Sequence, residues 1–280
     1  MVTRRRAAVL GSPVRHSLSP ALHAAAYRVL GLDWTYEARE VDEAALAGFV
    51  AGLDETWAGL SLTMPLKRAA IPLCDTLGKV AAAVGAVNTL TFEDAGRHGE
   101  NTDVPGLVNA LAEVGVTEVP AAAVLGGGAT AASAIAALAG MCTGEVEVYV
   151  RTAARAEELL PLAEQFGVPL VVRSWDDVAR AADAPLVIST APKGAADSLA
   201  AGLPDDLATL FDVVYDPWPT PLAAAWAARG GTVLGGLDLL IHQAVLQVEL
   251  MTAHPVPRDE VVAAMRSAGL AVLAARAAHS

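Results

Sequence analysis

Hydrophobic positions along the first hundred residues alternate between short apolar runs and helical periodicity. The runs at 7–10, 60–63 and 87–92 are typical of buried strands, and 34–41 is strand-like. Between the first two strands, Leu22, Ala25, Ala26, Val29 and Leu30 share one helical face. We expect Ser19 to cap this helix, with Pro20 at its first position. The pattern predicts an α/β domain.

From residue 121 onward, strands and helices alternate more regularly. The predicted strands are 121–125, 145–150, 168–172, 185–189, 210–214 and 232–234, with helical patterns between most of them. This alternation predicts a doubly wound parallel sheet of the Rossmann type. The remaining residues, 237–278, predict two helices interrupted at 254–257.

The stretch 124–131, Val-Leu-Gly-Gly-Gly-Ala-Thr-Ala, has the strongest ligand-binding pattern. A predicted strand ends there, and a small-residue helix begins near Thr130, with the spacing G-x-G-x-x-A. A helix N-terminus presents free N–H groups and a positive dipole end, which suit a phosphate. The next strand follows at βαβ distance, which favours a dinucleotide site over an ordinary glycine turn.

The same region carries no charge between Glu118 and Glu145, which raises the possibility of a membrane span. The glycines in its middle argue against one, and a buried central strand with its helix is uncharged for the same packing reason. The second predicted strand ends at Arg151-Thr152, with Arg155 following and no acid at the strand end. Arginines there accommodate a 2′-phosphate, so we expect NADP; ordinary solvated arginines are the alternative.

Composition narrows the class of protein. A chain of 280 residues predicts one large or two medium domains, and its net charge of −12 argues against nucleic acid or an anionic membrane as partner. The cysteines, Cys74 and Cys142, lack metal-ligand spacing and fit a reducing cytosol, so we expect no metal site. Three arginines precede an apolar run too short for a signal peptide, which predicts a cytoplasmic protein.

Six further motifs occur in a fixed order around the glycine stretch. They are Gly11-Ser12-Pro13-Val14-Arg15-His16-Ser17-Leu18-Ser19-Pro20-Ala21-Leu22-His23, Thr63-Met64-Pro65-Leu66-Lys67, Gly85-Ala86-Val87-Asn88-Thr89, Asn101-Thr102-Asp103, Tyr215-Asp216-Pro217 and Gly236-Leu237-Asp238-Leu239-Leu240-Ile241-His242-Gln243-Ala244. Together they closely resemble the shikimate dehydrogenase family over nearly the whole chain. The resemblance implies reversible, NADP-dependent reduction of 3-dehydroshikimate to shikimate in aromatic amino acid biosynthesis.

The resemblance also implies a set of site residues. Lys67 and Asp103 would be the catalytic pair that handles the proton and holds the reacting hydroxyl. The substrate would be bound by Ser17, Ser19, Thr63, Asn88, Asp103, Tyr215 and Gln243. The cofactor would be bound by Gly126, Gly127, Gly128, Ala129, Thr130, Arg151, Thr152, Arg155, Val213 and Gly236.

Several of these residues also have a purely structural interpretation. The alternatives are a solvated lysine for Lys67, helix caps for Ser19 and Asp103, a turn cap for Asn88 and a surface position for Gln243. Until side-chain contacts are known, both interpretations stay open.

Three positions depart from the family pattern, and two histidines need separate comment. Ser61 and Val150 stand where the family commonly has Asn, and Ala129 where it usually has Gly. These changes affect the wall of the substrate site and details of cofactor binding. His16 and His23 lack the spacing of a metal or catalytic pair, so we expect a polar loop residue and a packed helix residue.

The predicted organisation is a substrate-binding and catalytic domain at 1–104, an NADP-binding domain at 105–236, and helices at 237–280 that return to the first domain. The return follows from Gln243, which must reach a substrate held by that domain, and we expect the site in the cleft between the domains. Two alternatives are an NAD-preferring quinate/shikimate dehydrogenase and a catalytically silent shikimate- and nucleotide-binding regulator. A monomer and a homodimer both remain open.

Overall fold

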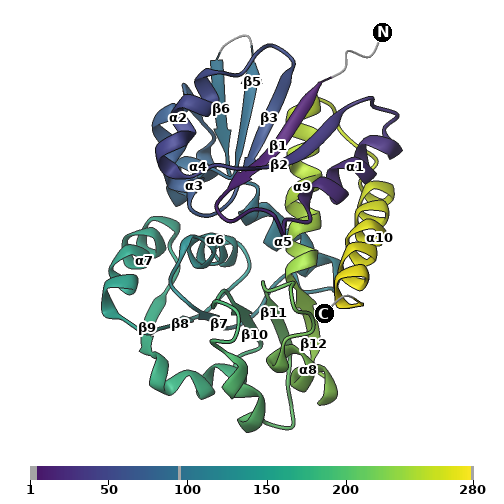
Figure 1. The fold of residues 1–280 in the computed structure, drawn as a ribbon. Helices are drawn as coiled ribbons and strands as arrows, with labels where there is room; N and C mark the ends of the chain where they lie inside the picture. The colour runs from purple at the N-terminus through teal and green to yellow at the C-terminus, as the bar shows by residue number, and fades with distance from the viewer. Residues whose placement is uncertain (1–4, 94–95, 279–280) are drawn as a thin grey trace. The chain divides into compact units, whose positions relative to one another are not determined.

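The computed structural model describes residues 5–93 and 96–278. The chain divides into two compact units, Met1–Gly106 with Leu240–Ser280, and Leu107–Leu239 (Figure 1). Both crossings between units fall inside helices, the first in α5 (Asp103–Glu113) and the second in α9 (Gly236–Thr252). Each unit has its own sheet and its own apolar core.

The sheet of the first unit is mixed, with strand order β2-β1-β3-β5-β6-β4. Its strands are β1 (Arg6–Gly11), β2 (Thr35–Glu40), β3 (Trp57–Leu62), β4 (Thr76–Leu77), β5 (Thr89–Glu93) and β6 (Gly96–Glu100). The first three pair in parallel, whereas β5 runs antiparallel to both of its neighbours. Every residue of β3 is buried, as a central strand covered on both faces requires.

Helices cover both faces of this sheet (Figure 1). They are α1 (Ser19–Val29), α2 (Glu43–Ala51), α3 (Leu66–Ala69), α4 (Lys79–Val84), the start of α5, most of α9, and α10 (Arg258–Ala277), with a short 3₁₀ turn at Ile71–Leu73. Met251 of α9 is buried against Ala7 of β1 and Ala58 of β3, so α9 supplies part of the core. The C-terminal helices therefore belong to the first unit.

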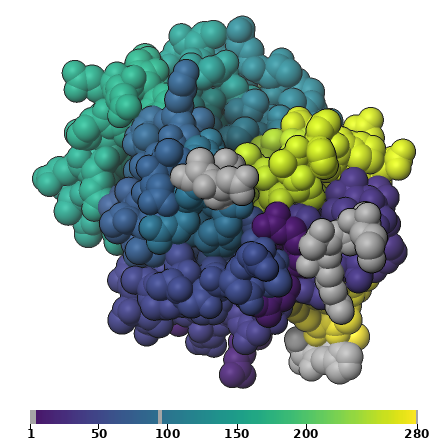
Figure 2. Space-filling model, turned by 90° about the horizontal axis from the view of Figure 1, so that it is seen from above, coloured from purple at the N-terminus to yellow at the C-terminus, as the bar shows by residue number. Residues whose placement is uncertain are grey.

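Helices from the beginning and the end of the described chain pack together in this unit. The α10 helix packs along α1, and in Figure 2 the yellow C-terminal surface adjoins the purple N-terminal segments. The prediction of Ser19 as the cap of α1 is wrong, because Leu18 already has a helical backbone and stands at the cap position. The Ser17 hydroxyl accepts the Ser19 N–H at 3.2 Å instead.

The second unit is a doubly wound sheet of six parallel strands in the order β9-β8-β7-β10-β11-β12. They are β7 (Ala122–Leu125), β8 (Val146–Val150), β9 (Leu170–Ser174), β10 (Leu186–Ser189), β11 (Thr209–Asp212) and β12 (Thr232–Gly235). The chain starts at the centre and winds outward in both directions, which confirms the Rossmann-type prediction.

The connections of this sheet are three α-helices and two 3₁₀ helices. The α-helices are α6 (Ala129–Leu138), α7 (Ala153–Phe166) and α8 (Pro221–Ala228), and the 3₁₀ helices are Trp175–Asp183 and Asp197–Gly202. Residues 131–138 of α6 and all of β7 are buried, which explains the uncharged stretch by packing. No helix within residues 5–93 and 96–278 is long and apolar enough to cross a membrane.

Candidate active site

A buried ion pair lies at the centre of the polar cluster in the first unit. Lys67 comes from the four-residue helix α3, and its Nζ donates to Asp103 Oδ2 at 2.5 Å. The two side chains are only 18% and 9% exposed. Removing one partner of such a pair leaves an uncompensated buried charge, so both residues are needed together. Lys67 is therefore not a solvated surface lysine.

The start of α5 is capped by Asn101, which leaves the Asp103 carboxylate available. Asn101 Oδ1 accepts the N–H groups of Asp103 at 3.0 Å and Val104 at 3.3 Å, and its amide donates to the Ala86 carbonyl. Asp103 is the first residue of α5, where the helix dipole favours a negative charge. The alternative in which Asp103 caps this helix is wrong, because a side chain two residues earlier performs that role.

Asn88 binds the same carboxylate, and Gln243 lies beside Asn88 and Thr102. The Asn88 amide donates to Asp103 Oδ1 and to Thr102 Oγ1, each at 2.9 Å, and Asn88 Oδ1 accepts the Thr102 N–H. Gln243 Oε1 lies 3.4 Å from both Asn88 Nδ2 and Thr102 Oγ1. Gln243 is buried, so its surface interpretation is wrong. The sequence analysis did not include Thr102 among the site residues, although its position in the Asn101-Thr102-Asp103 motif was a usable signal.

The loop that follows β1, which leads to the predicted substrate residues Ser17 and Ser19, lies beside Thr63. Ser12 donates its N–H to the Met64 carbonyl at 3.0 Å, which joins this loop to the end of β3. A Cβ on Gly11 would collide with Thr63 Cγ2, so glycine is required for this approach. Ser19 is buried and Ser17 partly buried. Among the described residues, no hydrogen bond joins either serine to the Lys67–Asp103 pair.

A second buried polar cluster, absent from the sequence-based predictions, lies in the same unit. Tyr36 donates to Ser61 Oγ at 2.6 Å, and Ser61 donates to Gln247 Oε1 at 2.8 Å. The His23 ring stacks on Tyr36 with centroids 3.8 Å apart, and its Nε2 lies 3.3 Å from Gln247 Oε1. Gln247 follows Gln243 by one helical turn on α9, and that spacing was the missed signal.

Burial determines the charge states in this second cluster. Desolvation lowers the pKa of His23 to about 3, against the opposing effect of its Gln247 hydrogen bond. Desolvation also raises the pKa of Tyr36, against the hydrogen bonds with Ser61 and Ser19. His23 is thus neutral at pH 7. It is packed in the helix, as predicted, while His16 is exposed. Ser61 interacts with Tyr36 and Gln247.

In the second unit, the three glycines between β7 and α6 have different surroundings. Gly126 has φ +112°, and a Cβ there would lie 2.7 Å from Thr190 Oγ1. Gly127 has an ordinary backbone, but its Cβ would lie 2.7 Å from Arg155 Cβ. Gly128 is the N-cap of α6, so no side chain at this position bonds the first N–H groups of the helix. A Cβ added there would meet nothing within 4 Å. Of the three, only Gly128, followed by Ala129 and Thr130, leaves open space beside free helix N–H groups.

The end of β8 presents a positively charged surface. Arg151, Thr152 and Arg155 are exposed, and neither arginine forms an ion pair with any residue that the structure describes. Thr152 is the N-cap of α7 without a side-chain cap bond, and no acid occupies the first turn of the helix. Arg155 packs against Gly127, which brings this surface to the glycine turn. The arrangement suits a phosphate.

The end of β11 carries Val213 and Tyr215. A Cβ on Gly236 would collide with the Val213 carbonyl oxygen, so the chain requires glycine there. Buried Asp212 accepts the Thr220 hydroxyl at 2.7 Å and the Val214 N–H at 3.3 Å, which closes the intervening loop. Burial raises the pKa of Asp212 despite these hydrogen bonds. Tyr215 is partly buried.

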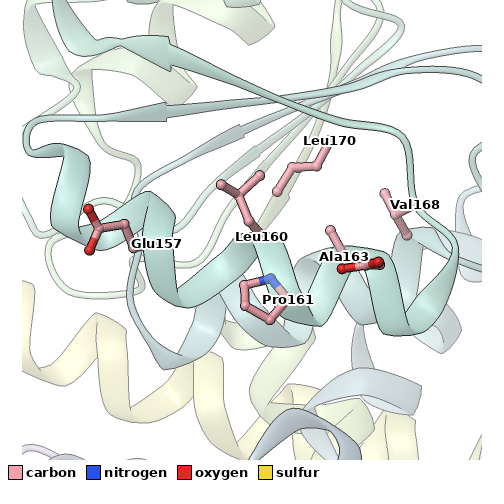
Figure 3. A pocket seen from close by; sticks show the side chains of 7 residues that line it. Glu157, Leu160, Pro161, Ala163, Val168 and Leu170 are labelled. Atoms are coloured by element: carbon pink, nitrogen blue, oxygen red, sulfur yellow. The ribbon is translucent and has the colours of Figure 1, made fainter.

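Other features of the surface match no predicted role. A shallow hollow between α7 and β9 is lined by Glu157, Leu160, Pro161, Ala163, Glu164, Val168 and Leu170 (Figure 3). Its lining residues include two carboxylates and no cation, so it does not suit a phosphate. Among the described residues, no three His, Cys, Asp or Glu side chains are grouped to hold a metal ion. Cys74 and Cys142 are free thiols.

Comparison with known proteins gives matches along almost the entire chain. The family model of the shikimate dehydrogenase substrate binding domain matches residues 9–90, and that of the shikimate 5'-dehydrogenase C-terminal domain matches residues 236–266. The shikimate dehydrogenase (NADP(+)) of Thermus thermophilus is 38% identical over 95% of this chain and 99% of its own length. The Methylobacterium radiotolerans enzyme of the same name is 39% identical over 94% and 98%.

Solved structures give the same result. Mycobacterium tuberculosis shikimate dehydrogenase aligns with a TM-score of 0.87 and 40% identity, covering 94% of this chain and 99% of that one. The Thermus thermophilus shikimate 5-dehydrogenase in complex with NADP(H) and shikimate aligns with a TM-score of 0.80 and 36% identity, with coverage of 94% and 99%.

Proposed function

The chain belongs to the shikimate dehydrogenase family, and on that basis we propose that it catalyses the reversible NADP-dependent oxidation of shikimate to 3-dehydroshikimate. The observation that carries the proposal is the buried Lys67–Asp103 pair, oriented by Asn88 and by the Asn101 cap. In a catalytically silent regulator nothing would maintain this pair. Its presence therefore favours an enzyme.

Lys67 and Asp103 perform the proton chemistry in this proposal. NADP(H) supplies or accepts the hydride when bound. Lys67 Nζ holds the proton at the reacting oxygen, where charge develops during hydride transfer. The Asp103 carboxylate accepts a hydrogen bond from the substrate hydroxyl and keeps Lys67 in place. Both groups are largely shielded from water, which strengthens their electrostatic effect.

Neutral polar side chains hold the rest of the substrate in this proposal. Ser17 and Ser19 donate their hydroxyls to the substrate carboxylate, which needs donors and no further charge. The ring hydroxyls are bound by Thr63, Asn88 and Gln243. The resemblance to the family assigns Tyr215 to substrate binding as well.

The residues of the second unit fit NADP. Exposed Arg151 and Arg155, without an ion partner among the described residues, would hold the 2′-phosphate. The free N–H groups at Gly128, Ala129 and Thr130 would hold the pyrophosphate. We assign Thr152, Val213 and Gly236 to the remaining cofactor contacts. An NAD-preferring enzyme would leave the two arginines without a function.

A four-way assay tests the proposal. The parent protein is given shikimate or quinate, each with NADP or NAD, and formation of reduced nucleotide is followed by absorbance. Shikimate with NADP should be the fastest combination. Equal rates with NAD would support the quinate/shikimate alternative, and binding without turnover in any combination would support the regulator.

Location and assembly belong to the same proposal. We place the protein in the cytoplasm, which is supported by its free thiols and its pathway of aromatic amino acid biosynthesis. Light scattering of the purified protein decides between the monomer and the homodimer.

A further inference from the structure

A backbone N–H and a side-chain carboxylate fix the orientation of the buried Asn88 side chain. Its Oδ1 lies 2.8 Å from the Thr102 N–H, which can only donate. The nitrogen must then face Asp103, to which it donates at 2.9 Å. If the amide were reversed, an oxygen would face the carboxylate and an N–H would face another N–H. The catalytic carboxylate is therefore held by an amide with one allowed orientation.

The Gln247 side chain is fixed by the same reasoning. Its terminal nitrogen lies 3.2 Å from the Asn88 carbonyl oxygen, which can only accept. The same nitrogen donates to Thr89 Oγ1 at 3.0 Å, while Gln247 Oε1 accepts from Ser61. Gln247 is fully buried, and its polar atoms are engaged within the protein.

Thr89 connects these two amides. Its hydroxyl accepts from Gln247, so its single proton is available for Asn88 Oδ1, 2.8 Å away. We propose that Thr89 and Gln247 are positioning residues, which set the Asn88 amide and through it the Asp103 carboxylate that pairs with Lys67. The inference rests on the proposed function only for its kinetic test.

The proposed relay predicts a specific kinetic defect. The Thr89→Val variant keeps the shape of the side chain but removes one of the donors that fix Asn88 Oδ1. One hydrogen bond corresponds to about a tenfold effect, so kcat/KM for shikimate should fall by about tenfold. KM for NADP should stay within about twofold, because no relay residue lies in the second unit. The Thr89→Ser variant retains the hydroxyl and should recover most of the loss.

The same strand offers a matched control. Thr91 is also a buried threonine of β5, and its hydroxyl has no hydrogen-bond partner among the described residues. The Thr91→Val variant makes the same chemical change outside the relay and should keep parental kinetics within about twofold. Equal defects in the Thr89 and Thr91 variants would overturn the proposal, since they would reflect a general effect on β5.

A double-mutant cycle tests whether Thr89 acts through Asn88. In an Asn88→Ala background the amide is absent, so adding Thr89→Val should change kcat/KM by less than about threefold. A further tenfold loss in that background would show that Thr89 acts by another route. The Gln247→Met variant should show the same dependence on Asn88, and it serves if Thr89→Val does not fold.

A measurement without substrate separates the relay from the proposed function. The side-chain NH₂ resonances of Asn88 in ¹⁵N-labelled protein are assigned by their loss in Asn88→Ala. They should be sharp in the parent and in Thr91→Val, and broadened by exchange between orientations in Thr89→Val and Gln247→Met. Unbroadened resonances in both relay variants would overturn the relay even if the parent oxidises shikimate. If the parent is inactive but the relay variants show the broadening, the relay is retained and the proposed function is rejected.

Discussion

The catalytic pair in the first unit and the arginines at the end of β8 in the second unit differ in where their polar groups find partners. In the first unit, Asp103 and Asn88 are buried, Lys67 is largely buried, and hydrogen bonds link Lys67 to Asp103 and Asp103 to Asn88. In the second unit, Arg151 and Arg155 are exposed and have no ion partner among the described residues. Hence the first set is organised by folding, whereas the second requires a ligand to satisfy its charges.

This difference has consequences for energy and rate. A catalytic carboxylate that is fixed before substrate binds needs no reorganisation during the reaction, which favours catalysis. Solvated arginines cost the fold little and gain charge-assisted hydrogen bonds when a phosphate arrives. The first set should therefore be sensitive to side-chain geometry, and the second to ligand charge and ionic strength.

The largest expected effect comes from breaking the Lys67–Asp103 pair. Replacing Lys67 by Ala removes the proton donor and leaves the Asp103 carboxylate buried without a cation. We expect kcat at saturating shikimate and NADP to fall by about 10²–10⁴-fold. Lys79→Ala is the control, because Lys79 is exposed and begins a different helix. A Lys67→Ala kcat within a few-fold of the parent would remove Lys67 from the mechanism.

The next largest effect concerns the two exposed arginines of the proposed NADP site. Replacing Arg151 and Arg155 by Ala should weaken NADP binding by about 100-fold or more and leave NAD binding nearly unchanged, since each charge-assisted hydrogen bond contributes about 1.5–3 kcal/mol. Titration calorimetry with both nucleotides measures this, with exposed Arg28→Ala as control. Added salt should weaken NADP binding in the parent more than in the variant. Equal losses for NADP and NAD would contradict the assignment.

Sequence reasoning succeeded where the signal was local or periodic. The glycine turn, the six parallel strands and the two C-terminal helices followed from patterns within a short window. Helix starts were less accurate, because capping depends on which nearby side chain reaches the free N–H groups. Ser17 and Asn101 do so here, and the helices begin at Ser19 and Asp103.

The site shows the same limit more clearly. Lys67 and Asp103 came from resemblance, and the structure adds that they form a buried pair. The spacing of Gln247 from Gln243 was a usable signal for Gln247 alone. Its contact with His23, and the stacking of His23 on Tyr36, could not be predicted, because these residues lie on separate elements and meet only after folding. Polar partners so distant in sequence leave no periodic signal.

The buried His23 makes the folding stability of the first unit depend on pH. Its folded pKa of about 3 lies below the unfolded value of 6.5, so the unfolded state binds more protons between these values. Stability is fully present above pH 6.5 and falls as pH decreases toward 3. Between pH 7.5 and pH 5 the loss from this group should be about 2 kcal/mol.

Denaturant unfolding at several pH values measures this loss. The His23→Gln variant cannot gain the proton, so its stability should change less across this range, whatever its absolute value. His16→Gln replaces an exposed histidine and should keep the parental dependence. If His23→Gln and the parent lose the same free energy on acidification, His23 does not determine the acid sensitivity.

The smallest expected effect separates a structural glycine from a ligand-binding one. Gly126→Ala is strained by its positive φ and by contact with Thr190, so this variant should lose stability. Gly128→Ala enters open space with an extended backbone, and the reduced freedom of the unfolded chain opposes the poorer N-cap, so its stability should change by no more than about 1 kcal/mol. If the pyrophosphate lies against Gly128, the added methyl should still weaken NADP binding by about three- to tenfold. Thermal melts and NADP titrations of the same samples give both quantities. Unchanged NADP affinity in Gly128→Ala would move the pyrophosphate away from the start of α6, and the free N–H groups there would lose their assigned ligand.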